Sequence, residues 1–285
     1  MMRFRNPCPR WSAAAWVLAA LPGLRAPAHE HLAAGALTSE AGAALLFVNA
    51  ANFAAESGYV VPLTESIAGP YAGWHHAELA FVCQAATPDF GGPAPFHPVL
   101  GARIEAVIET IDGPAGGRFG FWETPGDAAM ATELTFDLPV GTTDGTSRFP
   151  VSENDGAPGA DPYGHIHGRV FSGSLPGLYR IGFRFVDTSA NGPGGGPLHP
   201  PSPRYALFFQ AGITIASVAD LPSGPEVTFA AVNDHQYVLE ASPELGAGAL
   251  WTPVGEPVTG DNRLHRLQAS PVTDLRFYRL RRDPL

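Results

Sequence analysis

Glycine and proline limit what this chain can fold into more than any other feature of its sequence. Its 285 residues include 33 glycines and 29 prolines, which together exceed a fifth of the chain. Proline lacks a backbone N–H and clashes inside a helix, and glycine weakens helices through its backbone entropy. The composition therefore favours short strands joined by many turns over long helices.

Alternating apolar residues predict where the strands lie. In segment 177–187, Tyr179, Ile181, Phe183 and Phe185 alternate with arginine and glycine, which is typical of a strand with one buried face. Segment 205–215 is almost continuously apolar, as expected of a strand buried on both sides. Further candidates are 43–48, 75–83, 103–111, 119–122 and 133–138. These strands predict an all-β fold, an antiparallel β-sandwich, with a jelly-roll arrangement as the alternative.

The ends of the chain differ in composition from its middle. Residues 1–28 have the features of a Sec-type signal peptide, since an arginine-containing start precedes the apolar stretch 11–24 and Ala26-Pro27-Ala28 offers a cleavage pattern. We therefore expect a secreted protein, located in the periplasm, outside the cell or on its surface. Residues 29–220 are expected to form the β-sandwich. The turn-rich sequence at 221–225 begins a small C-terminal β module, 221–285, with about five short strands.

Several classes of function are excluded or disfavoured by composition. The 17 basic residues are all arginines, so a phosphate-binding or Schiff-base lysine is excluded. The formal net charge of −10 disfavours nucleic acid and anionic lipid as partners. Beyond Cys8 of the predicted signal peptide, Cys83 is the sole cysteine; this excludes a disulfide framework, and we expect Cys83 to be buried on a strand. Nucleophile-elbow, zinc-protease and dinucleotide-binding motifs are absent. The sequence therefore indicates a binding protein without catalytic turnover.

The histidines carry the clearest chemical signal. Two pairs have the spacing H-x-H, His29 with His31 and His165 with His167. Residues two apart on a strand point to the same face, so both imidazoles of a pair can reach one point. Four nitrogens from two such pairs would satisfy a tetrahedral zinc ion. The alternative is that these are ordinary histidines on surface turns.

Other residues are weaker candidates for metal binding. His97 and His199 lie in proline-stiffened loops and are possible additional ligands. In the acidic loop before His165, the carboxylates of Glu153, Asp155 and Asp161 could bind Ca²⁺, but their spacing lacks the alternation of an EF-hand. His75 aligns with an apolar strand face and is expected to be a core or strand-end residue, while its neighbour His76 faces the other way. His235 and His265 of the small module are interpreted as structural.

The predicted cleavage site raises a copper alternative. Cleavage after Ala28 would make His29 the N-terminal residue. Its α-amine, its ring and the ring of His31 could then chelate Cu²⁺, because amine and imidazole nitrogens suit tetragonal copper. A copper-binding protein, or an oxidative copper enzyme, is therefore a minor hypothesis.

Several blocks of the sequence resemble one group of secreted bacterial proteins. The blocks are 29–35, 113–123, 152–168 followed by 176–179, and 191–199. They are similar to proteins repressed by the zinc regulator Zur, many of which carry a PEP-CTERM sorting tail. The resemblance covers about residues 29–215 and is most specific at 152–212. It implies zinc capture or handling outside the cytoplasm, with His29, His31, His165 and His167 as the best-matched ligands and His97 and His199 less closely matched.

The C-terminal part departs from that group. In place of a sorting tail, segments 237–242, 250–255 and 276–280 resemble a small β module common in exported proteins of Verrucomicrobia and their relatives. This difference leaves open how the protein would attach to a surface.

The sequence thus predicts an exported zinc-binding protein, a scavenger, store or chaperone in zinc homeostasis. Neutral imidazoles would be its ligands, so binding should fall as the pH drops below about 6.5. The competing hypothesis is a surface adhesion or glycan-binding sandwich. In that case exposed Trp74, Trp122 and Tyr163 would make the contacts, and the histidines would be incidental.

Overall fold

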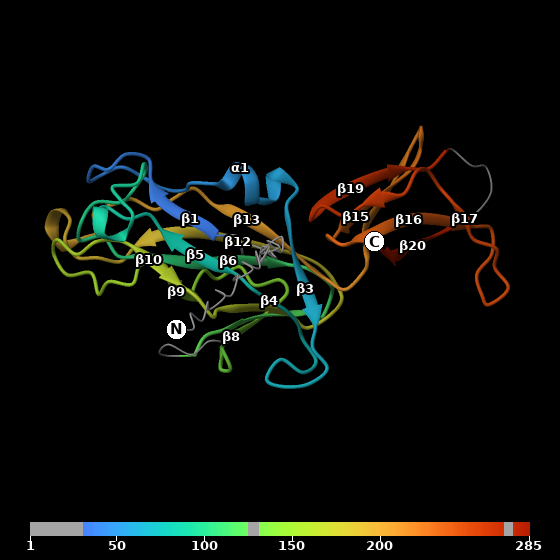
Figure 1. Ribbon diagram of the computed structural model, residues 1–285, viewed down its shortest axis with the longest axis horizontal. Coiled ribbons are helices and arrows are strands. Elements are labelled where there is room, and N and C mark those ends of the chain that lie inside the picture. Colours follow the sequence, from blue (N-terminus) through green and yellow to red (C-terminus); the bar gives the residue numbers. More distant parts are fainter. Residues whose placement is uncertain (1–30, 125–130, 271–275) are drawn as a thin grey trace, which may run out of the picture.

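The structure is a computed structural model that describes residues 31–124, 131–270 and 276–285. The predicted signal peptide and His29 lie outside the described residues. Nearly all regular structure is β (Figure 1), which confirms the predicted fold class. The described helices are single turns: α1 (Ala50–Phe53), η1 (Ala55–Ser57), η2 (Pro88–Phe90) and η3 (Pro193–Gly195). In these parts of the chain, none is long and apolar enough to cross a membrane.

A nine-stranded sheet forms the larger layer of the sandwich. Its spatial order is β8-β7-β11-β4-β3-β13-β12-β6-β9, and every neighbouring pair is antiparallel except β13 and β3. The strands are β3 (Val60–Glu65), β4 (His75–Glu78), β6 (Ile104–Asp112), β7 (Arg118–Trp122), β8 (Leu134–Pro139), β9 (Arg148–Pro150), β11 (Val170–Gly173), β12 (Gly177–Asp187) and β13 (Tyr205–Ala211).

A four-stranded sheet forms the second layer. Its order is β10 (Gly164–Ile166), β5 (Ala80–Cys83), β1 (His31–Ala36) and β2 (Leu45–Phe47). Strand β5 is antiparallel to β10 and parallel to β1. Segments that are far apart in sequence therefore lie side by side on either edge of β5.

Phenylalanines from both sheets fill the core. Phe47 and Phe81 of the small sheet contact Phe183 of the large sheet, with ring centroids 5.8 and 6.0 Å apart. Cys83 is fully buried in the same cluster, as predicted. Burying one large aromatic side chain stabilises a fold by about 1.5–3 kcal/mol, so this cluster holds the two sheets together.

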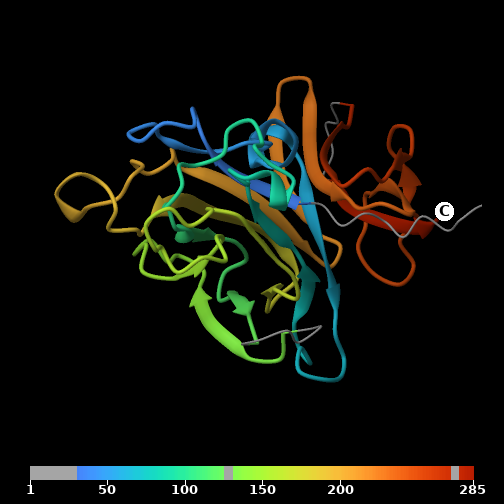
Figure 2. The same cartoon turned by 60° about the vertical axis from the view of Figure 1, so that its left-hand side comes forward.

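Two smaller sheets follow β13, and Figures 1 and 2 both show them, in orange to red, on one side of the other strands. One comprises β14 (Ile215–Leu221), β15 (Gly224–Ala231) and β19 (Arg263–Gln268). The other comprises β16 (His235–Ser242), β17 (Thr252–Pro253), β18 (Val258–Thr259) and β20 (Phe277–Pro284). The predicted domain boundary at residue 221 falls inside the β14–β15 hairpin and stays a prediction.

One predicted strand is two strands in the structure. The segment 75–83 divides at Leu79 into β4 of the large sheet and β5 of the small sheet. Leu79 is buried, and its N–H donates to the carbonyl of Arg169 instead of continuing either ladder. The chain crosses between the layers here, and the crossing places β5 between β1 and β10.

Candidate metal centre

Strand register brings three histidines together on the outer face of the small sheet. His31 of β1 pairs with Ala80, and His165 of β10 pairs with Val82. Residues opposite each other in a sheet share a face, and residues two apart on one strand also share a face. Since Ala80 and Val82 are two apart on β5, His31 and His165 project from the same face, on either side of β5. His167 follows directly after the end of β10.

The three imidazoles are in contact. The Nε2 atoms of His31 and His165 are 2.8 Å apart, the distance of a hydrogen bond in which one ring donates to the other. The ring centroids of His165 and His167 are 4.2 Å apart, and those of His31 and His167 are 6.0 Å apart. One nitrogen from each ring lies within 4.8 Å of the other two. The predicted convergence of the second H-x-H pair with His31 is thus present.

This arrangement fits a metal ion after small side-chain movements. Tetrahedral zinc with Zn–N bonds of 2.0–2.1 Å needs ligand nitrogens about 3.3 Å apart. The 2.8 Å separation of the His31 and His165 nitrogens is about 0.5 Å too short for this. An ion would therefore replace the proton shared by the two rings and spread them slightly.

Carboxylates hold the backbone on either side of the H-x-H pair. The N–H of His165 donates to Oε1 of Glu153 at 2.7 Å, and the N–H of Gly168 donates to Oε1 of Glu78 at 3.0 Å. In the described part of the chain, strand β10 lies at a sheet edge, where no further strand supplies acceptors for these N–H groups. The two carboxylates take the place of such a strand.

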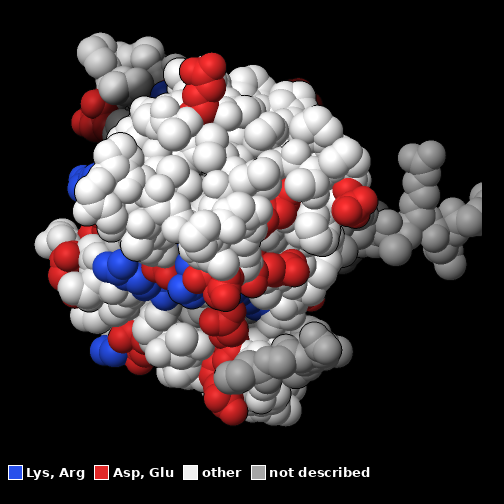
Figure 3. Space-filling model, turned by 90° about the vertical axis from the view of Figure 1, so that its left-hand side faces the viewer, with Lys and Arg blue, Asp and Glu red and all other residues white. Residues whose placement is uncertain are grey.

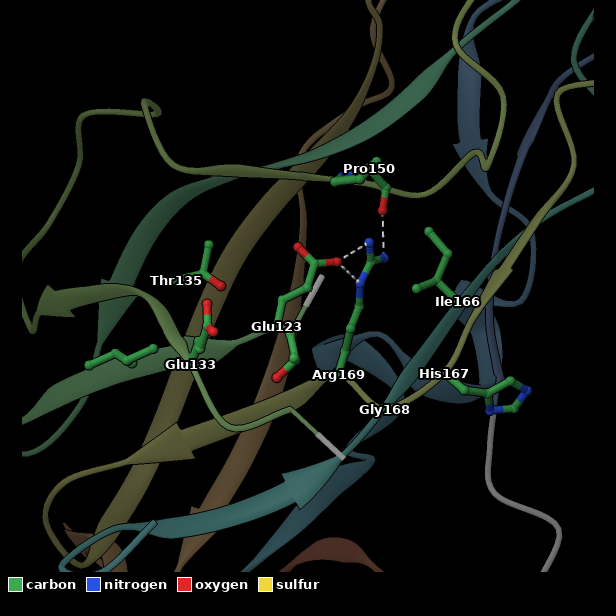
Figure 4. Close-up of a pocket in the computed structure, with 10 residues that line it drawn as sticks. Glu123, Glu133, Thr135, Pro150, Ile166, His167, Gly168 and Arg169 are labelled. Atoms are coloured by element: carbon green, nitrogen blue, oxygen red, sulfur yellow. Dashed lines mark hydrogen bonds and ion pairs between the residues drawn. The ribbon is translucent and has the colours of Figure 1, made fainter. Parts of the chain in front are cut away.

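A pocket of about 460 Å³ adjoins the cluster, with His167 at its border (Figure 4). Arg169 lies against it with a side chain only 1% exposed; its Nε donates to Glu123 at 2.7 Å and its Nη1 to the carbonyl of Pro150 at 2.5 Å. Burial lowers the pKa of the Arg169 guanidinium, while the charge of Glu123 opposes that shift. The ring of His167 points away from the Arg169–Glu123 pair in Figure 4. The arginine therefore anchors the chain after the cluster and does not reach into it.

The end of the molecule opposite the C-terminal sheets carries mixed charge. In Figure 3 basic and acidic side chains occur together in one band, and most of the face above it is uncharged. Arginine–glutamate neighbours of this kind occur on the large sheet, where Arg103 and Arg148 both lie within 4 Å of Glu105. This face has no continuous positive patch of the kind that binds nucleic acid.

The remaining predicted ligands lie apart from the cluster. The Nε2 of His199 accepts the N–H of Val99 at 2.9 Å, and its Nδ1 is 2.8 Å from the carbonyl of Ala43. Both ring nitrogens of this buried residue thus hold loops together, and the structure does not bring His199 to the cluster. The Nδ1 of His97 contacts the carbonyl of Pro98 at 2.8 Å, and His97 is likewise not among the three grouped histidines.

The aromatic residues expected to contact a glycan are not freely exposed. Trp122 is only 6% exposed, and its Nε1 donates to the hydroxyl of Ser172 at 2.8 Å. Trp74 packs edge-on against Trp122, and Tyr163 stacks on Phe90. The expectation of exposed tryptophans is therefore wrong for Trp122, because the loop before β4 folds over it.

The acidic loop uses its side chains within the fold. Asp161 accepts the N–H groups of Ala86 and Tyr163, and Asp155 accepts the N–H of Ala157. Among the described residues these carboxylates do not form a group suited to a metal ion. The loop instead sets the path of the chain into β10.

Sequence reasoning missed the residues that support the histidines. Arg169, Glu78 and Glu123 gave no signal of their own, because their partners are distant in sequence. For Arg169 the one available clue was its position, an arginine two residues after an H-x-H pair and directly before a run of apolar residues. An arginine in such a setting must bury its charge against a partner.

Comparisons with protein-family models, with curated proteins and with solved structures found no match. The fold and the three-histidine cluster therefore stand on the geometry alone. They define an all-β protein with a candidate metal centre at the edge of a sandwich.

Proposed function

We propose that this chain is an exported protein that binds Zn²⁺ through His31, His165 and His167, with His29 of the predicted mature N-terminus as the fourth ligand. The observation that carries the proposal is the meeting of three imidazole nitrogens within 4.8 Å, from segments 134 residues apart. Imidazole is a common ligand for zinc, and three or four such ligands suit its tetrahedral geometry. The resemblance of residues 152–212 to zinc-regulated secreted proteins supports zinc over other metals.

The proposed role is capture, storage or delivery of zinc rather than catalysis. The pocket beside the cluster is bordered by an arginine already paired with a carboxylate.

Cu²⁺ takes the same nitrogen ligands and generally binds them more tightly than Zn²⁺. Copper is therefore the alternative metal for this site.

Metal analysis of tag-free protein, expressed with its own leader, tests the proposal. We expect one zinc per chain near neutral pH, and at least about a 100-fold loss of zinc affinity in a His165→Ala/His167→Ala double variant. The matched control is His235→Ala/His265→Ala, which removes two histidines from the C-terminal sheets and should bind zinc like the wild type. N-terminal sequencing of the exported chain shows whether it begins at His29.

Two results would reject the proposal. Wild-type protein that takes up no zinc at neutral pH would favour the adhesion hypothesis. Equal zinc affinity in the wild type and the His165/His167 double variant would place any zinc elsewhere. A separate experiment lets the two metals compete for the protein. If the protein keeps copper while a zinc-selective chelator removes the zinc, copper is the resident ion.

A further inference from the structure

Asn49 lies at the start of a helix but does not make the side-chain hydrogen bond that is usual there. It is the N-cap residue of α1, a place where asparagine usually accepts an N–H from the first helical turn. Here its side chain makes no such bond. The ordinary reason for an asparagine at a helix start is therefore absent.

The carboxamide of Asn49 instead faces the first residues of β1. Its Nδ2 donates to the carbonyl of His31 at 2.8 Å, and its Oδ1 accepts the N–H of Ala33 at 2.9 Å. The β1–β2 ladder pairs Ala34 through Ala36 with Phe47 through Leu45, and one further backbone bond joins the N–H of Val48 to the carbonyl of Ala33 at 2.7 Å. A carboxamide has the donor and acceptor of a peptide group, so Asn49 extends the ladder to the histidine.

Glu153 has the same role at the opposite edge of the small sheet. Strand β10 has three residues, and among the described strands it pairs only with β5. The carboxylate of Glu153 accepts the N–H of His165 on the side where no strand follows. The two histidines that flank β5 are thus each fixed at the backbone by one side chain from outside their own strand.

We infer that Asn49 and Glu153 are positioning residues of the metal site: they fix the backbone of His31 and His165, so that the two imidazoles stay close enough to bind one ion after a small side-chain movement. The inference rests on the proposed metal-binding function. Its physical basis is preorganisation, because a ligand already held in place loses little conformational entropy on binding. Outer residues of this kind typically change metal affinity by about 10–100-fold when removed.

The experiment compares zinc affinity, the absorption spectrum of the Co²⁺-substituted protein and the melting temperature of the metal-free chain. Asn49→Ala should lower zinc affinity by about 10–100-fold and alter the Co²⁺ spectrum, since His31 loses its fixed position. Asn49→Asp keeps an acceptor for Ala33 but loses the donor to His31, so its affinity should fall between those of wild type and Asn49→Ala.

Glu153 allows the hydrogen bond to be separated from the charge. Glu153→Gln keeps an acceptor for the His165 N–H and should bind zinc within about threefold of the wild type, whereas Glu153→Ala should lose about 10–100-fold. Equal losses in both variants would assign the effect to the negative charge and overturn positioning by Glu153.

Ser202→Ala is the matched structural control. The Ser202 hydroxyl also accepts one backbone N–H, from Phe185, and donates to one carbonyl, that of Pro203. Its loss should lower the melting temperature without changing zinc affinity or the Co²⁺ spectrum. If the Asn49→Ala and Asn49→Asp variants both have the wild-type zinc affinity and Co²⁺ spectrum, the inference is overturned while the proposed function still holds. A wild type that binds neither zinc nor cobalt would overturn the proposed function, and the inference with it.

Discussion

Gly164 offers a test of the metal site in which no proposed ligand is substituted. It immediately precedes His165 on β10 and is buried. A Cβ at this position would lie 1.8 Å from the carbonyl oxygen of Val151 and 2.9 Å from the Cα of Ser152. Both atoms belong to the backbone, so no side-chain rotation can relieve the contact.

The backbone of Val151 and Ser152, which this Cβ would contact, is held by hydrogen bonds to Ile104. The N–H groups of Val151 and Ser152 donate to the carbonyl of Ile104 at 2.8 and 3.0 Å, and the Ser152 hydroxyl accepts the N–H of Ile104 at 2.9 Å. Strand β10 must therefore move instead. Real Cβ atoms keep at least 3.0 Å from other heavy atoms, so the shift is at least about 1.2 Å, several times the ~0.2 Å that metal–ligand distances tolerate.

We expect Gly164→Ala to destabilise the fold by about 1–3 kcal/mol, as overpacking usually does. We also expect zinc affinity to fall by at least about 100-fold, because His165 is carried away from His31. The assay is competition for zinc against a chromophoric chelator, after circular dichroism has shown that the variant is folded. Gly196→Ala is the control, since its Cβ would meet nothing closer than 3.5 Å. A folded Gly164→Ala protein with wild-type affinity would refute the reasoning; if it does not fold, His167→Ala, which leaves the backbone unchanged, tests the same cluster.

Two further predictions concern titratable groups away from the cluster. Burial raises the pKa of Glu240, but hydrogen bonds and charges from Arg279 and Arg281 outweigh it and leave that pKa below its ordinary value. Such a carboxylate stabilises the fold above its unfolded pKa of about 4.3 and loses this contribution as the pH falls through the folded pKa. Thermal unfolding should therefore show Glu240→Gln about 1–2 kcal/mol less stable than wild type at pH 7, with a difference that shrinks below about pH 4; a difference that is constant with pH would contradict this. Burial also raises the pKa of the Cys83 thiol to about 12, so peptide mapping should find it unalkylated by iodoacetamide at pH 8 in the folded protein and alkylated in guanidinium, whereas rapid labelling of the native chain would disprove its burial.

The sequence predicted local geometry better than long-range pairing. The alternation in 177–187 matches β12, and the H-x-H spacing correctly placed His165 and His167 on one side of the chain. Which other histidine would meet them depends on the pairing of β5 with β1 and β10. Apolar periodicity contains no information about that pairing, because many strands share the same pattern.

The places where the structure departs from the sequence predictions have the same origin. His199 had the proline-flanked setting of a loop ligand, but the carbonyl and N–H that use its ring come from residues 100 or more positions away. The continuous pattern of 75–83 concealed a change of sheet at Leu79, since both layers bury the same kind of side chain. The identity of the metal, export and the domain boundary stay predictions.

The place of β5 between β1 and β10 has a consequence for the order of events during synthesis. A ribosome releases His31 first, then β5, and His165 last, 134 residues after His31. Until that last strand emerges and docks, the nascent chain lacks two of the three imidazoles. A molecule that holds an ion through all three histidines is therefore one in which β1 and β10 have both already paired with β5.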